Sequence, residues 1–188
     1  MRLRFVRVAC ALILTLIVYR AAAQYPAPYH HLTPSEFAGQ PAYNAGDVVA
    51  MTNCNIDFNY TAHAEKNYYR LTCNINLIFN RDQSWIDRHK INTANAMAEV
   101  LNHEQGHYTI AYLEQQELMR TISRTVFTAN YQREASNMFD RIHQKYVQLS
   151  LDYDGDSEHM RNKQQQHSWD EYFKKKLMYM PPEELASN

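Results

Sequence analysis

The chain has 188 residues, of which 45% are hydrophobic and 21% are charged. These proportions are typical of one globular domain and exclude collagen-like, low-complexity and long coiled-coil proteins. Only four glycines are present, and the chain has neither a Gly-x-Gly-x-x-Gly nor a Walker A segment, which argues against nucleotide binding through those motifs. Its 19 Lys and Arg residues are balanced by 20 Asp and Glu residues. Because phosphate binding needs clustered cations, we expect no nucleic-acid partner.

Residues 1–23 have the pattern of a secretory signal peptide. A cationic start precedes a largely apolar run over residues 8–19, and three alanines before Gln24 offer a cleavage site. Arg20 ends the apolar run short of the roughly 20 residues that a membrane-spanning helix needs. The sequence therefore predicts an exported protein of the periplasm or the extracellular medium, without stable membrane insertion after cleavage. An uncleaved anchor is the alternative.

Two segments, residues 48–60 and 67–79, are rich in β-branched and aromatic residues that partly alternate with polar ones. Polar residues 63–66 lie between them, so two antiparallel strands are expected. A hairpin folded at this position brings Cys54 and Cys73 near the same rung. An oxidising compartment favours a bridge, and we predict a Cys54–Cys73 disulfide, with two buried free thiols as the alternative.

From residue 93 the apolar residues recur at three- and four-residue steps, which predicts a long helix over residues 93–120 with Thr93 as its N-cap. Two more amphipathic helices are expected over residues 133–149 and 157–177. An acidic break at residues 152–156 separates them.

These elements predict an α+β fold, a small antiparallel β-sheet followed by a long helix and two further helices. Residues 24–41 form an extended lead-in without periodicity. Residues 42–180 form a single domain, and residues 181–188 form a tail after the last helix.

Residues 103–107 read His-Glu-Gln-Gly-His, an H-E-x-x-H motif in the middle of the predicted long helix. Residues four apart lie on one helical face, so His103 and His107 can present nitrogens to one Zn²⁺. Glu104 then lies beside the ion as the candidate catalytic base for a water molecule. Gly106 costs a helix about 1 kcal/mol relative to Ala, which predicts close approach of another chain segment or a substrate. The alternative is two solvated or core histidines one turn apart.

A catalytic zinc site normally has three protein ligands, so a third must come from elsewhere in the chain. Ile110 and Leu113 stand where the extended H-E-x-x-H-x-x-G-x-x-H motif has Gly and His, which excludes that branch. On a helix over residues 157–177, His159 falls on the face that turns toward the core, whereas His167 points away from it. Three downstream candidates remain: Glu134, His143 and His159.

Several short segments in chain order carry a family resemblance. Through them the chain resembles a bacterial family of secreted proteins, a domain of unknown function whose members are described as predicted zinc-dependent proteases. Pro34, Ser157 and Met160 depart from the family's Trp, Thr and Gly. The matching segments are Phe37-Ala38-Gly39-Gln40-Pro41, Ser84-Trp85, Leu101-Asn102-His103-Glu104-Gln105-Gly106-His107, Tyr153-Asp154, Ser157-Glu158-His159, Gln166 and Trp169.

The resemblance implies a zinc peptidase with His159 as the third ligand. It also implies roles for two neighbours. Asp154 would accept the N–H of a ligating imidazole, and Tyr153 would donate to the developing oxyanion.

We therefore expect a secreted zinc-dependent peptidase that acts on a peptide or protein substrate. Its zinc would be held by His103, His107 and His159, with Glu104 as the base. The alternative is a non-catalytic zinc-binding envelope protein, against which Glu104 argues because a structural site has no use for a base. A third hypothesis, an adhesion module that uses Tyr-rich residues 24–31, rests on composition alone.

Overall fold

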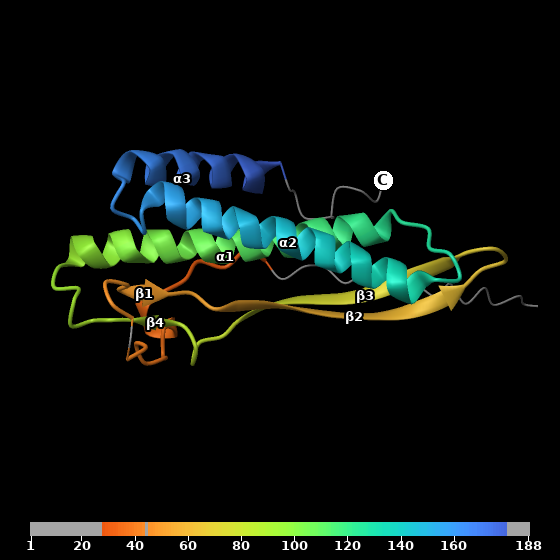
Figure 1. Ribbon diagram of the computed structural model, residues 1–188, viewed down its shortest axis with the longest axis horizontal. Coiled ribbons are helices and arrows are strands. Elements are labelled where there is room, and N and C mark those ends of the chain that lie inside the picture. Colours follow the sequence, from red (N-terminus) through yellow and green to blue (C-terminus); the bar gives the residue numbers. More distant parts are fainter. Residues whose placement is uncertain (1–27, 44, 180–188) are drawn as a thin grey trace, which may run out of the picture.

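The computed structural model describes residues 28–43 and 45–179. The expected signal peptide, the first residues of the lead-in and the tail lie outside the described residues. Two two-stranded antiparallel sheets and three helices confirm the α+β fold (Figure 1). The elements are η1 (Pro34–Glu36), β1 (Ala50–Met51), β2 (Cys54–Ala64), β3 (Tyr69–Phe79), β4 (Trp85–Ile86), α1 (Ala94–Ser123), α2 (Tyr131–Ser157) and α3 (Lys163–Met178).

The hairpin of β2 and β3 shows the predicted alternation, with every second side chain of β2 turned inward as far as Ala62. Its turn occupies residues 65–68, about two positions later than predicted, and Glu65 N–H donates to the Tyr68 carbonyl. Moving the centre of a hairpin by two residues moves each cross-strand partner by four.

The predicted Cys54–Cys73 disulfide is therefore wrong. Cys54 lies opposite Phe79, Cys73 lies opposite Tyr60, and both cysteines are free. Cys54 and Tyr60 are six positions apart on β2, or about 20 Å at about 3.4 Å per residue. A disulfide needs Cα atoms within about 7 Å, so these two thiols cannot meet.

The predicted strand over residues 48–60 divides into two strands that belong to different sheets. Ala50 pairs with Ile86 and Met51 with Trp85, so β1 joins β4 rather than the hairpin. Ser84 fixes this junction because its fully buried hydroxyl accepts the N–H of Asn53 at 2.9 Å. The short sheet lies at the opposite end of the molecule from the hairpin turn (Figure 1).

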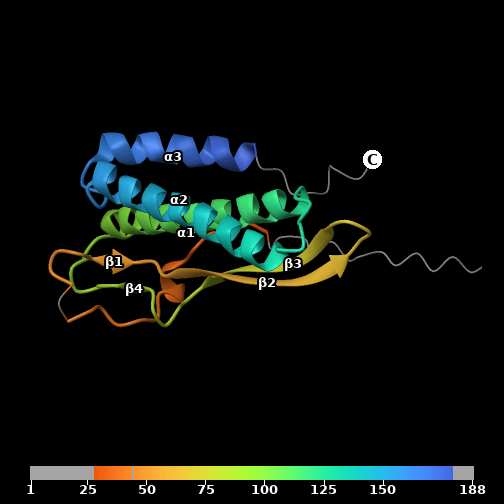
Figure 2. The same ribbon diagram turned by 45° about the vertical axis from the view of Figure 1, so that its right-hand side comes forward.

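The long helix begins as predicted, since the hydroxyl of Thr93 accepts the N–H of Ala96 at 3.0 Å. α1 contacts both hairpin strands, both other helices and β1. Figure 2 shows the three helices stacked above the two sheets, with α3 outermost. α1 therefore connects the hairpin end of the molecule to the β1–β4 end.

The predicted break at residues 152–156 is wrong, because α2 continues without interruption to Ser157. Tyr153 and Ser157 are fully buried there, and their packing outweighs the low helix propensity of the Asp- and Gly-containing segment. The chain reverses instead at Glu158, His159 and Met160, which have φ angles of 49°, 50° and 70°. α3 consequently starts at Lys163, and His159 lies before it.

Two buried clusters hold the elements together. The larger one joins the hairpin to the three helices, and the smaller one joins β1, β4 and the first half of α1. Leu32 and Phe37 are buried in the smaller cluster, so this part of the lead-in packs against the domain. Within the described part of the chain, no helix is both long and apolar enough to span a bilayer.

Candidate metal centre

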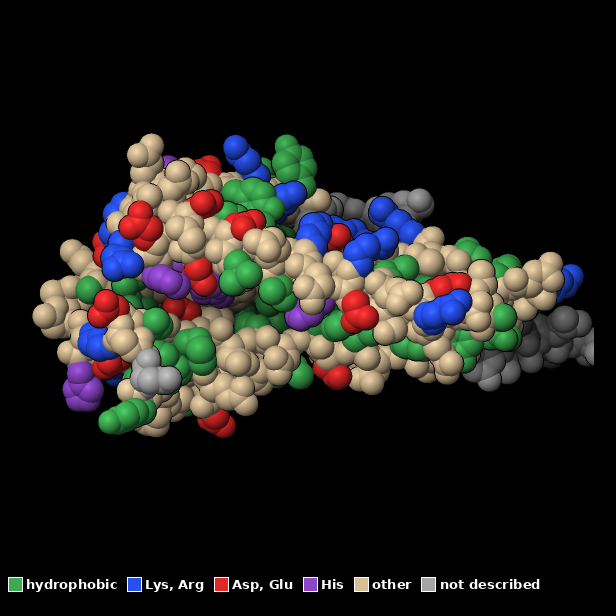
Figure 3. All heavy atoms as spheres, viewed as in Figure 1, with side chains coloured by type: hydrophobic (Ala, Val, Ile, Leu, Met, Phe, Trp, Pro, Cys, Tyr) green, Lys and Arg blue, Asp and Glu red, His purple; other side chains and the backbone are tan. Residues whose placement is uncertain are grey.

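A pocket of about 620 Å³ opens between β1 and the first half of α1. Its other wall is formed by α2 near Asp154 and by the turn that follows α2. Figure 3 shows histidine and carboxylate side chains gathered at a hollow in the surface of this end of the molecule. The H-E-x-x-H motif lines the pocket through His103, Glu104 and His107.

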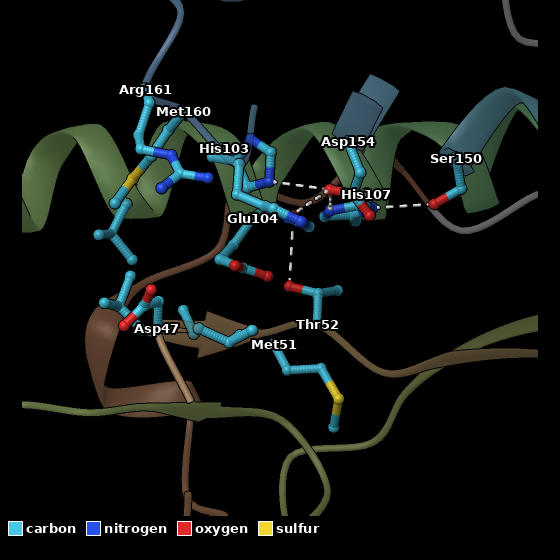
Figure 4. Close-up of a pocket in the computed structure, with 15 residues that line it drawn as sticks. Asp47, Met51, Thr52, His103, Glu104, His107, Ser150, Asp154, Met160 and Arg161 are labelled. Carbon is cyan, nitrogen blue, oxygen red and sulfur yellow. Dashed lines mark hydrogen bonds and ion pairs between the residues drawn. The ribbon is translucent and has the colours of Figure 1, made fainter. Parts of the chain in front are cut away.

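Three ligand-type atoms converge at the pocket wall. Oδ1 of Asp154 lies 3.2 Å from Nε2 of His103 and 3.0 Å from Nε2 of His107 (Figure 4). The two imidazole rings come from successive turns of α1, with their centroids 5.0 Å apart, and the carboxylate comes from α2. His103, His107 and Asp154 each offer one ligand atom, and these atoms lie within 4.8 Å of one another. Among the described residues, they form a group that could hold a metal ion.

The separations fit a small divalent ion. Two ligand atoms at about 2.0 to 2.1 Å from a tetrahedral zinc lie about 3.3 Å apart, close to the observed distances between Asp154 and the two histidines. Two imidazole nitrogens and one carboxylate oxygen are a recognised ligand set of catalytic zinc, although other divalent metals also accept them. The residues present therefore fit a metal ion with three protein ligands.

Each histidine is also held at its other ring nitrogen. Nδ1 of His103 lies 3.1 Å from Oε1 of Gln166 on α3, and Nδ1 of His107 lies 3.0 Å from Oγ of Ser150 on α2. Both Nε2 atoms are thereby directed toward Asp154. The sequence predicts no role for Ser150 or Gln166, although Gln166 is one of the residues that carry the family resemblance. Helical spacing could not place either of them, because they reach the histidines from separate helices.

Glu104 is 3% exposed and lines the pocket. Figure 4 shows its side chain directed into the space between α1 and β1. Its Oε2 atom is buried without a hydrogen-bond partner, which is unusual for a carboxylate oxygen. Burial raises the pKa of Glu104, against the opposing attraction of His107. The hydroxyl of Thr52, next to β1, donates to the Glu104 backbone carbonyl at 3.3 Å and ties this turn of α1 to the strand.

The carboxylates and imidazoles of the site shift one another's pKa values. Burial alone would raise the pKa of Asp154, but hydrogen bonds from His103 and His107 outweigh it and hold that pKa well below its usual range. Burial alone would lower the pKa of His107, but its hydrogen bond to Asp154 and the nearby Glu104 carboxylate raise it. The arrangement therefore favours an ionised Asp154 between two imidazoles.

His159, the predicted third ligand, lies beside this group rather than within it. Its Nδ1 is 3.4 Å from Oδ1 of Asp154, and its side chain is 59% exposed at the pocket. The expected helical presentation is wrong, because His159 occupies the left-handed turn after α2. Asp154, predicted to orient a ligand, instead contributes the third converging atom.

Tyr153 cannot donate to a substrate oxyanion from its position, and that prediction is wrong. Its side chain is fully buried, and its hydroxyl donates to the His103 carbonyl at 3.0 Å. The ring stacks on the His103 ring with centroids 4.7 Å apart. Gly106 permits this packing, since a Cβ there would lie 2.4 Å from the Tyr153 hydroxyl oxygen. The predicted close approach of another chain segment to Gly106 is confirmed.

The remaining ligand candidates lie elsewhere. Glu134 accepts hydrogen bonds from Thr128 at the start of α2, and His143 pairs with the buried Glu114 at 2.9 Å. His167 lines a smaller hollow between α1 and α3. None of the three belongs to the converging group formed by His103, His107 and Asp154.

The fold and the converging side chains define an α+β protein with a candidate metal centre on its longest helix. The chain belongs to the family described as "Bacterial protein of unknown function (DUF922)", whose model matches residues 35–160. The family resemblance found in the sequence is thereby confirmed. The match includes the H-E-x-x-H motif and Asp154 and ends before α3. Comparison with curated proteins and with solved structures gives no match.

Proposed function

We propose that the protein is an exported zinc-dependent peptidase. The observation that carries the proposal is the buried Glu104 carboxylate, which lines the pocket with one unpartnered oxygen next to three converging ligand atoms. A buried carboxylate without a full set of hydrogen bonds costs stability, so its position calls for a chemical role. The substrate class is a peptide or protein.

In this proposal His103, His107 and Asp154 hold the zinc. When bound, the ion would acidify a water molecule and polarise the scissile carbonyl. Asp154 supplies negative charge to the cation, while Ser150 and Gln166 hold the two imidazoles in place.

Glu104 acts as the general base and acid. Its carboxylate accepts a proton from the attacking water and passes it to the leaving amine. The raised pKa suits this exchange, because a catalytic group works best when its pKa lies near the operating pH. With Tyr153 buried, His159 and Arg161, which line the pocket from the turn after α2, are candidates to contact the substrate carbonyl.

The alternative, a zinc-binding envelope protein without catalysis, is less well supported. A structural zinc site fills its fourth position with a protein ligand. Here three ligand atoms converge at an open pocket, and Glu104 points into that pocket without joining them. The arrangement thus favours a centre that keeps one position for water.

The test is the substitution Glu104→Gln in the chain that begins at Gln24. It preserves size while removing the base, so hydrolysis of a peptide library should fall about 10²- to 10⁴-fold. Zinc content and melting temperature should remain close to wild type, because Glu104 is not a ligand. Peptide cleavage and metal content are measured on the same preparations.

Glu99→Gln is the matched control, since Glu99 lies on the same helix with its side chain 52% exposed in an ion pair with Lys163. It should retain full activity. Equal cleavage by wild type and Glu104→Gln would refute the catalytic role. Loss of zinc from Glu104→Gln would instead make Glu104 a ligand.

A further inference from the structure

We infer that Gln166, oriented by Asp170, is a positioning residue that keeps the ring proton of His103 on Nδ1 and so reserves Nε2 for the metal. Both residues lie on α3, which follows the segment matched by the family. The inference rests on the proposed metal site but not on peptidase activity. It makes the third helix a part of the metal centre.

The contacts of Gln166 fix which way its amide points. Its Nε2 lies 2.9 Å from Oδ1 of Asp170 and 2.8 Å from the Tyr153 hydroxyl oxygen. An ionised carboxylate accepts hydrogen bonds and donates none, so the NH₂ group must face Asp170. The carbonyl oxygen Oε1 is then the atom that faces Nδ1 of His103, at 3.1 Å.

The orientation of the amide determines the proton on the imidazole. An amide oxygen only accepts, so Nδ1 of His103 must carry a hydrogen to bond with it. Nε2 of His103 faces Asp154 and the candidate metal position. When a metal replaces the hydrogen bond between these two groups, a neutral imidazole with its proton on Nδ1 presents the lone pair of Nε2 to that metal. A reversed amide would set two donors against each other and oppose this form.

The hydrogen bond between His103 and Gln166 is buried, which increases the cost of losing it. His103 is 4% exposed and Gln166 is 7% exposed, so water cannot readily replace either partner. A buried N–H left without an acceptor costs about 1 to 3 kcal/mol. Gln166 is the partner that the structure gives to Nδ1 of His103.

Asp170 is itself anchored to α1. Both of its carboxylate oxygens accept from Nδ2 of Asn102, at 3.1 and 3.2 Å. Tyr153 closes the network, since its hydroxyl accepts from Gln166 and donates to the backbone carbonyl of His103. The ring and the backbone of His103 are therefore both tied to one amide on α3.

His107 provides an internal contrast. Its Nδ1 contacts the hydroxyl of Ser150, which can either donate or accept. Ser150 therefore holds the ring in place without dictating its proton. Of the two histidines, His103 is the one whose partner determines which ring nitrogen carries the proton.

The experiment measures zinc affinity, by competition with a chelator, for three variants of the chain from Gln24. Gln166→Met keeps the side-chain length and removes the acceptor, and it should weaken zinc binding about 10- to 100-fold. Gln166→Glu loses the donor to Asp170 but keeps an acceptor for Nδ1, so it should bind zinc more tightly than Gln166→Met, which loses both. Gln165→Met changes an exposed neighbour on the same helix and should bind like wild type.

A second readout separates positioning from packing. In zinc-loaded wild type, the protected Nδ1–H of His103 should give a proton NMR signal coupled to ¹⁵N. In Gln166→Met this signal should be lost to exchange with water, while the Gln165→Met protein keeps it.

The inference is overturned if Gln166→Met binds zinc as tightly as Gln165→Met and keeps the signal. It is also overturned if Gln166→Met and Gln166→Glu lose affinity equally. Zinc binding without peptide cleavage by wild type would refute the proposed function alone, and absence of zinc binding by wild type would refute both.

Discussion

The two ends of the molecule are built in different ways. The hairpin end, formed by β2 and β3, pairs eleven residues with eleven and buries one regular face of apolar side chains. The pocket end, formed by β1, β4 and the first half of α1, has only two pairs of strand residues and contains the buried polar side chains His103 and Glu104. Burial of apolar surface stabilises both ends, but the second end also needs specific hydrogen bonds to keep its buried polar groups satisfied. The candidate metal centre thus lies at the end of the molecule with the shorter sheet.

The largest expected effect on stability is at the hairpin end. Ile75 on β3 is 2% exposed in the larger core cluster, so Ile75→Ala should lower the free energy of unfolding by about 2 to 5 kcal/mol. Urea denaturation measures the change. Ile78→Ala, on the same strand but 43% exposed, should change stability much less. Equal losses for the two variants would mean that the hairpin face is not the stabilising one.

A smaller effect is expected where α1 meets Tyr153. Gly106→Ala places a Cβ 2.4 Å from the Tyr153 hydroxyl oxygen, and overpacking of this kind costs about 1 to 3 kcal/mol. The gain in helix propensity, about 1 kcal/mol, offsets only part of that cost. Because Tyr153 stacks on His103, zinc affinity should also fall. Thermal melts and zinc titration measure both changes.

Gly155→Ala is the matched control for this substitution. Gly155 also lies inside a helix, but outside its chain neighbours and its own helix backbone no atom lies within 4 Å of an added Cβ. The same change should therefore stabilise the protein by up to about 1 kcal/mol. A destabilised Gly155→Ala variant would contradict the steric explanation for Gly106.

The smallest effect concerns the cysteines, Cys54 at the open end of the hairpin and Cys73 near its middle. Burial raises the pKa of Cys54 to about 12, with a contribution from Glu104, and burial raises the pKa of Cys73 to about 11. Both are therefore protonated at neutral pH and should react slowly with iodoacetamide in the folded chain. After denaturation without a reducing agent, mass spectrometry should find both alkylated. If both cysteines resist alkylation after denaturation, Cys54 and Cys73 are joined by the disulfide that the strand register excludes.

Sequence patterns predicted the hairpin end better than the pocket end, and the difference is physical. Period-two alternation and a polar turn are local signals, so both long strands could be recognised before their register was known. The pairing of Ala50 with Ile86 depends on chain segments 36 positions apart, and two-residue strands carry no periodicity. The strand over residues 48–60 was therefore predicted as one element.

The candidate metal centre also combines residues that local patterns predict with residues that they do not. His103, Glu104 and His107 could be predicted because helical spacing alone places them together. Asp154 was assigned a supporting role, since its part in the converging group depends on how α2 crosses α1. The turn before α3 could have been predicted from the sequence. The family has Gly where this chain has Met160, and the φ angle of Met160 is 70°. A glycine there is typical of a left-handed turn, which is the conformation observed.

The separation of β1 and β4 in the chain has a consequence for the order of folding. The hairpin closes across Ala64 and Tyr69, whereas the short sheet pairs Ala50 with Ile86, which come close along the chain only after the hairpin has paired Cys54 with Phe79. Local contacts generally form faster than distant ones, so the hairpin and the helices should assemble first and the pocket last. A folding intermediate would then hold the H-E-x-x-H helix without the β1 wall of its pocket. If the protein is a peptidase, a nascent chain would remain inactive until its distant segments meet.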